Sequence, residues 1–344
     1  MKAYFVSDLH FGVRNASVEW LNNQVSFFEN FMIPNTEKNS YLIIGGDIFD
    51  NRQNLNIFVF HTVTNLFKRL SEHFKEIHII IGNHDISNKT TNEVNALSIF
   101  NLIPNIFVYE KPELKILNGT KFLFLPWSNH EEYKVIQQYK PQEPDYLVMH
   151  TDISSLKLNK YREISGGVSM LELTDFKYVF NGHIHYRQEK DNIVMMGCPY
   201  HLNRNDLDND KYIYVLDIQE NKLSKILNNY SSKFKQIDFY SLIEMTETEA
   251  KKEFCGHYIY IRIPNSITFD NGINSVLYML DCSRNIKILY YDDYEYQEPD
   301  IGGTEEISIE NIMDEYINNL NQDDSAKLEI RNILEKYKSE IVFN

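Results

Sequence analysis

Five short segments of this sequence combine aspartate, asparagine and histidine, each directly after an apolar run. They are Asp8-Leu9-His10, Gly45-Gly46-Asp47, Gly82-Asn83-His84-Asp85, His150 and Gly182-His183-Ile184-His185. Carboxylate, amide and imidazole ligands without a thiolate suit Mn²⁺ or Fe²⁺, with Mg²⁺ and Zn²⁺ less favoured but compatible. Two such ions sharing a water molecule hydrolyse phosphate esters. The residue types therefore indicate a hydrolytic centre with a pair of divalent metal ions.

The apolar runs before these segments are typical of buried β-strands. They cover residues 3–7, 41–44, 79–81, 146–149 and 178–180. Ligands of open α/β sheets bind beyond the carboxyl ends of the strands, so we expect the five polar segments to meet there. One polar side chain at a strand end is ordinarily a capping or packed group. Five of them together are costly to desolvate unless something binds them.

The elements that must position these segments form an α/β fold. Residues 18–31, 56–74 and 93–102 have apolar residues at helical spacing, and residues 121–125 and 192–196 are further strands. The predicted architecture is two sheets packed together with helices outside. Residues 211–218 and 222–227 are expected to form a hairpin.

The chain divides into three predicted parts. Residues 1–230 form the catalytic domain, and residues 231–298 form a small α+β capping domain with a β-α-β-α-β pattern. Residues 299–344 contain the end of an acidic linker and two amphipathic helices. Residues 291–344 hold 15 acidic and 4 basic side chains, which accounts for 11 of the 15 net negative charges. The acidity thus says little about the catalytic face.

Two classes of protein are disfavoured by composition. No apolar run approaches the roughly 20 residues that span a membrane, so we expect no membrane association. Cys198, Cys255 and Cys282 are scattered and odd in number, which fits a reducing cytoplasm and argues against a disulfide scaffold.

The order of the five motifs resembles the calcineurin-like metallophosphoesterases. The layout is similar to their SbcD branch, the Mre-eleven family of double-strand-break repair nucleases, and most similar to its T-even phage members. The segments that carry this resemblance are residues 46–50, 125–127, 182–186 and 312–318. For a phage-encoded chain, the cytoplasm in question would be that of the host.

The resemblance implies a role for each site residue. Asp8, His10, Asp47 and His185 would bind one metal, and Asp47, Asn83, His150 and His183 the other, with Asp47 bridging. His84 would be a catalytic residue that ligates no metal, and Asp85 would orient it. The alternative for His84 is a hydrogen bond to a metal ligand. Asp50 stands where archaeal and eukaryotic members often have histidine, so the role of that histidine does not transfer; bacterial and phage members also have aspartate there.

The resemblance also implies a function and partners. The function is a nuclease that hydrolyses phosphodiesters of duplex ends and of single-stranded DNA. It would act with an SbcC- or Rad-fifty-like ATPase in recombination and repair, bound through residues 304–344, and as a homodimer through residues 56–74 and 93–102. The alternatives are a phosphomonoesterase or cyclic-nucleotide phosphodiesterase on the same fold, and a scaffold without metal activity.

Overall fold

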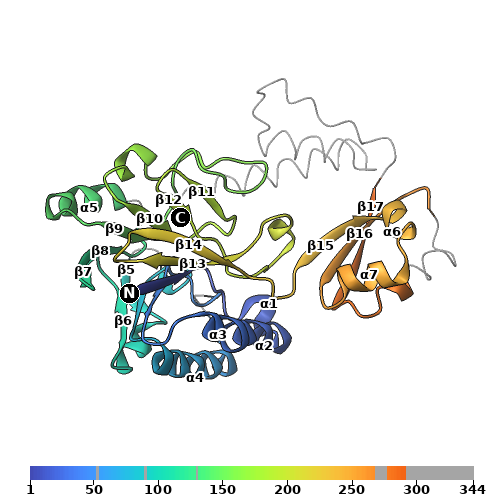
Figure 1. Cartoon of the computed structure of the whole chain (residues 1–344), viewed down its shortest axis with the longest axis horizontal. Coiled ribbons are helices and arrows are strands. Elements are labelled where there is room, and N and C mark those ends of the chain that lie inside the picture. The colour runs from blue at the N-terminus through green and yellow to red at the C-terminus, as the bar shows by residue number, and fades with distance from the viewer. Residues whose placement is uncertain (52–53, 89–90, 129–130, 268–276, 292–344) are drawn as a thin grey trace, which may run out of the picture. The chain divides into compact units, whose positions relative to one another are not determined.

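Two six-stranded sheets form the centre of the computed structural model. The structure describes residues 1–51, 54–88, 91–128, 131–267 and 277–291. The first sheet contains, in order, β14 (Lys222–Leu227), β13 (Tyr212–Asp217), β1 (Lys2–Val6), β2 (Tyr41–Ile44), β3 (Glu76–Ile80) and β6 (Ile106–Tyr109). The second contains β11 (Gln188–Lys190), β12 (Ile193–Met195), β10 (Tyr178–Asn181), β9 (Tyr146–Met149), β8 (Thr120–Leu125) and β7 (Glu113–Leu117) (Figure 1).

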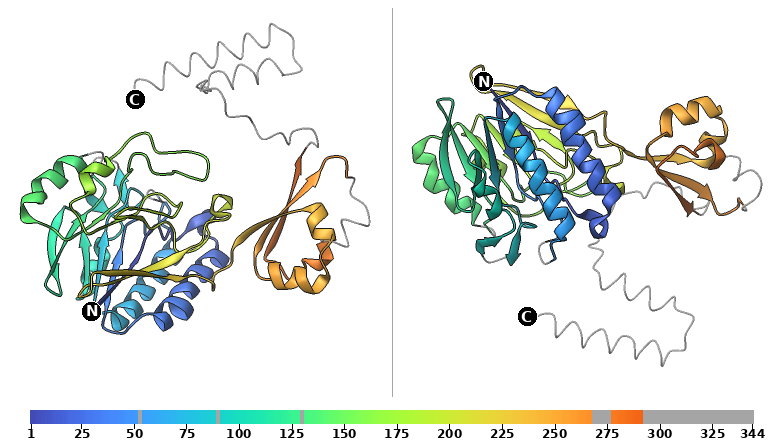
Figure 2. Two further views of the ribbon diagram at one scale, coloured as in Figure 1. Left: turned by 45° about the horizontal axis from the view of Figure 1, so that its top comes forward. Right: turned by 90° about the horizontal axis from the view of Figure 1, so that it is seen from below.

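Alternation along the strands explains the layers. Side chains of a strand point to opposite faces in turn. In β1, Ala3 and Phe5 face the core between the sheets, whereas Tyr4 and Val6 belong to the core outside the first sheet. The outer core is covered by α2 (Val18–Ser26) and α4 (Ile57–His73), which lie side by side in Figure 2. The expected two-sheet sandwich with outer helices is therefore confirmed.

The central strands are parallel, which brings their carboxyl ends to the same edge. In the first sheet, β1, β2, β3 and β6 run parallel, and β13 pairs antiparallel with β1. In the second, β8, β9, β10 and β12 run parallel. The loops after β1, β2, β3, β9 and β10 carry the five polar segments.

Residues 93–102 differ from the helix expected there. Residues Thr91–Asn95 form the strand β5, which pairs with β4 (Ile86–Asn88), and a 3₁₀ turn covers Ser98–Leu102. The Asn95 side chain accepts hydrogen bonds from the backbone N–H groups of Leu97 and Ser98. Asparagine competes in this way with helical hydrogen bonds, which explains why the apolar spacing was misleading here.

A left-handed turn, α1 (Val13–Ala16), follows the Asp8-Leu9-His10 segment. Arg14, Asn15 and Ala16 have φ values of 57°, 55° and 58°. This conformation costs a non-glycine residue about 1–2 kcal/mol. Three consecutive residues in this region form an unusually strained segment beside the polar loops.

The second module is a three-stranded parallel sheet with its own core. It contains β15 (Phe234–Asp238), α6 (Phe239–Ile243), α7 (Glu247–Phe254), β16 (Tyr258–Pro264) and β17 (Asn285–Tyr291). Trp20 of α2 stacks on Tyr258 with 5.0 Å between ring centroids and packs against Phe234. The Tyr258 hydroxyl donates to Glu19 of α2 at 2.9 Å. Helix α2 thus touches this module directly.

The chain separates into two compact units, Met1–Tyr291 and Asp292–Asn344. The second unit lies outside the described residues, as do the predicted linker and tail helices. Within the described part, no helix is long and apolar enough to cross a bilayer.

Candidate metal centre

The loops after the central strands hold their polar side chains with strained backbone. Asp8, His10, Asp47 and His183 have positive φ values of 55°, 47°, 53° and 78°. Such conformations cost of order 1–3 kcal/mol each and persist where the surroundings force them. Here four residues from three loops share the strain, and all four side chains enter the same site.

Glycines allow these loops to approach one another. A Cβ on Gly82 would lie 2.1 Å from Oδ1 of Asp47, and a Cβ on Gly182 would lie 2.2 Å from Oγ of Ser7. Neither contact is possible without displacing a loop. The glycines of the Gly-Asn-His-Asp and Gly-His-x-His segments are therefore required by packing, a role that the sequence reasoning did not assign.

One cluster that could hold a metal contains Asp8, His10 and His185. The Nε2 atoms of His10 and His185 are 2.8 Å apart. This is close to the roughly 3 Å between neighbouring ligands of an ion with bonds of about 2.1 Å. Oδ2 of Asp8 is buried and has no hydrogen-bond partner in the described part of the chain. A cation bound among these atoms would satisfy that oxygen.

A second cluster contains Asp47, His150 and His183, with the amide of Asn83 beside it. Nε2 of His150 and Nδ1 of His183 each lie 3.0 Å from Oδ1 of Asn83. The other ring nitrogen of His150 contacts the Gly45 carbonyl at 2.7 Å. A carbonyl partner of this kind fixes the orientation of a ligating imidazole.

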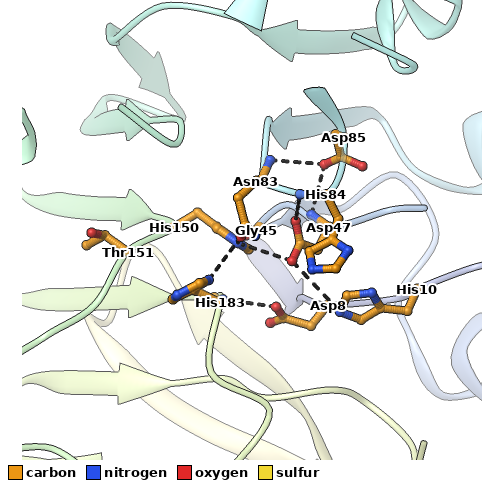
Figure 3. Close-up of polar contacts among 12 residues, drawn as sticks. Asp8, His10, Gly45, Asp47, Asn83, His84, Asp85, His150, Thr151 and His183 are labelled. Carbon is orange, nitrogen blue, oxygen red and sulfur yellow. Dashed lines mark hydrogen bonds and ion pairs between the residues drawn. The ribbon is translucent and has the colours of Figure 1, made fainter. Parts of the chain in front are cut away.

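Asp47 lies between the two clusters, as Figure 3 shows. Its Oδ2 is 3.3 Å from Nε2 of His150 and 3.8 Å from Nε2 of His10. Its Oδ1 accepts a hydrogen bond from the backbone N–H of His84 at 2.8 Å. The structure thus brings the other six expected ligand side chains together around this carboxylate.

The protonation states fit a cation site. Burial and the nearby charge of His10 lower the pKa of His185 to about 4, so its ring is neutral at pH 7. Burial alone would lower the pKa of His150, but the Asp47 charge raises it to about 9. Burial likewise opposes ionisation of Asp47, yet His150 and His10 lower its pKa below the ordinary value. In the metal-free protein the His150 ring is therefore protonated at pH 7, and it would lose this proton when a metal ion binds.

Asp85 does not orient His84, which corrects one expectation. Its carboxylate accepts from the backbone N–H groups of Asp47, Ile48, Phe49 and Gly82. The His84 ring is held instead by the Asp50 carbonyl, 2.7 Å from its Nδ1. An aspartate one residue after the histidine points back into the loop, because consecutive side chains in this turn face different ways. Asp85 thus shapes the loop that carries Asp47.

Asp50 is a positioning residue that sequence reasoning left without a role. Besides the carbonyl contact with His84, its carboxylate lies 3.5 Å from Nδ1 of His10. The spacing Gly-Asp-x-x-Asp was a signal for this residue, although not for its partners.

Two side chains that hold the backbone of ligand residues in place were not predicted from the sequence. The Gln24 side chain of α2, which is 2% exposed, donates to the carbonyls of Leu9 and His10 at 2.7 and 3.1 Å. On the other side, the buried Lys211 ammonium donates to the His185 carbonyl at 3.0 Å and pairs with the buried Asp206. Both supports come from segments far away in the sequence, and neither has a motif of its own.

The comparisons with known proteins agree with this geometry. The calcineurin-like phosphoesterase family matches residues 1–187. Exonuclease subunit 1 of Enterobacteria phage T4 is 25% identical over 334 residues, which are 92% of each chain. Putative phosphoesterase 078R of Invertebrate iridescent virus 3 is 22% identical over 204 residues, which are 56% of each chain.

Two solved structures are similar at a lower level. One is a novel archaeal phosphodiesterase, with a TM-score of 0.35, 17% identity, and coverage of 66% of this chain and 99% of that chain. The other is the nuclease MPE of Pseudomonas putida, with a TM-score of 0.29, 14% identity, and coverage of 65% and 87%.

Proposed function

Because this chain belongs to the calcineurin-like phosphoesterases, we propose that it is a DNA nuclease of the SbcD type, dependent on two divalent metal ions. The coarser activity, hydrolysis of phosphodiester bonds, follows from the family and from the T4 exonuclease subunit to which the chain is similar. The observation that carries the proposal is the position of the Asp47 carboxylate, between His10 at 3.8 Å and His150 at 3.3 Å.

The six side chains around Asp47 divide into two ligand sets. Asp8, His10 and His185 would hold one ion, Asn83, His150 and His183 the other, with Asp47 shared. When bound, the ions would lower the pKa of a shared water and neutralise charge at the phosphate. The oxygen and nitrogen donors favour Mn²⁺, with Mg²⁺ also compatible.

His84 is the proposed general acid. A water oxygen attacks phosphorus, the bond from phosphorus to O3′ breaks, and a proton from Nε2 of His84 neutralises the departing oxygen. The 2.7 Å contact of Nδ1 with the Asp50 carbonyl supports this role, because it leaves Nε2 on the opposite side of the ring. The ring lies 4.9 Å from that of His10, centroid to centroid, and so beside the first ligand set.

The proposal also names three partners: DNA, an ATPase and a second copy of the chain. We assign DNA as the substrate, and an SbcC- or Rad-fifty-like ATPase as the partner of residues 304–344. The similarity to a protein named a subunit supports an assembly. A homodimer through the start of α4 is supported by Ile57 and Phe58, which are 85% and 53% exposed.

The lysines of the hairpin and second module support only a limited DNA surface. The candidates are Lys222, Lys225, Lys233, Lys235, Lys251 and Lys252, and four of them pair with carboxylates of the same chain. These pairs are Lys225 with Glu189, Lys233 with Asp210, Lys235 with Glu253, and Lys251 with Glu247. Such pairs are exposed and weak, but they reduce the charge available to phosphates.

A cleavage assay with end-labelled DNA tests the function. Duplex, hairpin and single-stranded DNA are incubated with the purified protein and Mn²⁺, with and without the ATPase. The Asp47→Ala variant, which removes the shared ligand, serves as the inactive control. We expect Mn²⁺-dependent cleavage by the wild type and loss of both cleavage and Mn²⁺ binding in the variant. Hydrolysis of a phosphomonoester or a cyclic nucleotide without DNA cleavage would favour the alternative phosphatase or cyclic-nucleotide phosphodiesterase.

A further inference from the structure

The sheet of the second module has one face that belongs to its core and one that is aromatic. Helices α6 and α7 pack in a core with Ile259 and Ile261 of β16. Side chains alternate along a strand, so Tyr258 and Tyr260 point to the other face. There, Phe234 of β15 lies 5.0 Å from Tyr258, centroid to centroid. The aromatic face is thus separate from the module's own core.

A groove of about 400 Å³ lies along this aromatic face, between the module and the start of α2. Its lining residues fall within 14–20, 258–260 and 284–287, together with Phe234, and the structure describes every residue of these segments. None of the seven ligand candidates is among the lining residues. The groove is therefore distinct from the metal centre.

Positive charge predominates in the groove. Arg14, Arg284 and Lys287 line it, and Glu19 is the one carboxylate among the lining residues. Glu19 is already engaged, because it lies 3.3 Å from Arg284 and accepts from the Tyr258 hydroxyl at 2.9 Å. Arg14 and Lys287 have no carboxylate partner within the described part of the chain. In a chain with a net charge of −15, two such cations at one groove point to an anionic ligand.

The Arg14 guanidinium is held in place with most of its hydrogen-bonding capacity unused. Its Cζ lies 4.4 Å from the Trp20 ring centroid and 5.4 Å from that of Phe234. One of its nitrogens donates to the Leu202 carbonyl at 3.3 Å. A guanidinium has five N–H donors, so most of them remain available. A planar fork that is fixed by stacking is well suited to a phosphate.

Lys287 reaches the groove from the module. It is exposed, and in the parallel ladder it stands opposite Tyr260. Unlike Arg14, it stacks on no ring of the described residues, so packing of the module does not account for it. The Cζ of Arg204 lies 5.3 Å from the centroid of the Tyr260 ring, which adds a further cation beside the groove.

Cations around aromatic rings suit a nucleotide, because the charges contact phosphate and the rings stack on a base. The volume falls within the roughly 300–1,000 Å³ that is usual for small-molecule sites. We propose that this groove binds a nucleotide, either free or as one unit of single-stranded DNA. Its phosphate lies between Arg14 and Lys287, and its base lies beside Tyr260. This second site goes beyond the nuclease function proposed above and does not depend on it.

The test measures binding to the full-length protein with EDTA present, so that nothing is cleaved. Calorimetric titrations use dAMP, deoxyadenosine, inorganic phosphate and a deoxyadenylate hexamer. We expect saturable binding of dAMP and weaker binding of deoxyadenosine and of phosphate, each of which lacks one half of the ligand. A hexamer that binds more tightly than dAMP would assign the groove to a DNA strand, and one that binds no more tightly would assign it to a free nucleotide. Either result supports a nucleotide site.

Two variants and one control locate the site. Lys287→Gln removes a phosphate contact, and Tyr260→Leu removes the ring beside the base. We expect the Kd for dAMP to rise about tenfold in each, the loss typical of one hydrogen bond to a charged group or of one stacked base. Lys252→Gln removes the same charge from an exposed position of α7 outside the groove and should leave the Kd unchanged.

Three results would overturn the proposal. They are an unchanged Kd in Lys287→Gln, an equal rise in Lys252→Gln, and no saturable binding of dAMP up to about 1 mM. The first two hold even where Tyr260→Leu fails to fold. Because the assay contains no metal, each of these results would leave the nuclease function intact. A wild type that binds dAMP but cleaves no DNA when loaded with Mn²⁺ would overturn the nuclease function alone.

Discussion

The Asp47 side chain contacts three partners from three different loops. Oδ1 accepts the His84 N–H, and Oδ2 faces His150 and His10. Asparagine would present a donor in place of one oxygen, which would repel either an N–H or a cation. Only an ionised carboxylate satisfies all three partners, so this position determines the chemistry of the whole centre.

His84→Ser should separate metal binding from catalysis. His84 is not one of the seven ligand candidates, so the variant should bind as many Mn²⁺ ions as the wild type in a calorimetric titration. DNA cleavage should fall by about 10²–10⁴-fold, the usual contribution of a general acid. Hydrolysis of bis(p-nitrophenyl) phosphate should fall less, because nitrophenolate leaves without a proton. Equal losses for both substrates would contradict the leaving-group role.

Gly82→Ala should disturb the centre through packing alone. The new Cβ would lie 2.1 Å from Oδ1 of Asp47 and 2.5 Å from its backbone nitrogen. We expect weaker Mn²⁺ binding and a lower Tm in calorimetry. Gly119→Ala is the matched control, because a Cβ at that glycine meets nothing within 4 Å, although its φ of 82° adds strain. Normal Mn²⁺ affinity in Gly82→Ala would show that the loop can relax.

The residue types at the site were predictable from sequence, but their supports were not. Asp8, Asn83 and His150 follow recognisable apolar strands, so their shared edge of the sheet could be inferred. Asp85 was assigned to the wrong partner, because sequence adjacency does not tell which way a side chain points. The Asp50 carbonyl that holds His84 is a backbone atom, which no residue pattern identifies.

At the scale of elements, α2 connects the metal centre with the second module. Gln24 contacts the carbonyls of Leu9 and His10, while Glu19 and Trp20 contact Tyr258. A helix over residues 18–31 was predicted from its apolar spacing, and α2 covers Val18–Ser26 of this range. That its polar residues would support a ligand loop on one side and a separate module on the other was not, since both partners are distant in sequence.

Gln24→Leu should weaken the first ligand set. The substitution keeps the side-chain volume and removes the donor to the carbonyls of Leu9 and His10. We expect about a tenfold loss of Mn²⁺ affinity at one of the two sites, which is typical of outer partners of a ligand. Gln219→Leu, on an exposed turn, is the control. Unchanged affinity in the Gln24 variant would indicate that Tyr200, which also donates to the Leu9 carbonyl, is sufficient.

The buried pair of Asp206 and Lys211 predicts a pH dependence of stability. Burial raises the pKa of Asp206, but the charge of Lys211 and the hydrogen bonds from Lys211 and from the Asn203 N–H together lower it, so the net shift is downward. A carboxyl with a lowered folded pKa stabilises the fold above its unfolded pKa of about 3.9, and this stabilisation is lost as the pH falls through the folded value.

Two variants test this pair. Asp206→Asn should flatten the fall of Tm below about pH 4 in thermal scans of the metal-free protein. Lys211→Met should cost about 3–5 kcal/mol near pH 7, because it leaves the Asp206 charge buried without a cation. Parallel acid profiles for the wild type and Asp206→Asn would contradict the assignment.

On the scale of the whole chain, the ligand candidates and the most acidic segment lie in different parts of the sequence. The seven ligand candidates lie between residues 8 and 185, whereas 15 of the 49 acidic residues lie after residue 291. The similarity to T4 exonuclease subunit 1 extends over 92% of this chain, well beyond the phosphoesterase family match. The similarity to this exonuclease subunit therefore includes residues after 187, which the family match does not cover.

Deletion of residues 304–344 should separate cleavage from assembly. The deleted segment contains apolar residues at helical spacing, which favours docking into a groove of another chain. Mn²⁺-dependent cleavage of single-stranded DNA should persist, while co-purification with the ATPase and ATP-stimulated cutting of duplex should be lost. A truncated protein that binds the ATPase with unchanged affinity would contradict the docking role.

The chain contains two tryptophans, and the fold gives them different surroundings. Trp20 stacks on Tyr258 of the second module, and Trp127 lies 5.2 Å from the His183 ring. Indole emission responds to local polarity and to nearby quenching groups. With Trp127→Phe, fluorescence would report only the contact between α2 and the module, and with Trp20→Phe only the surroundings of His183. The molecule thus carries two built-in optical reporters, which allow metal loading and module attachment to be followed separately in solution.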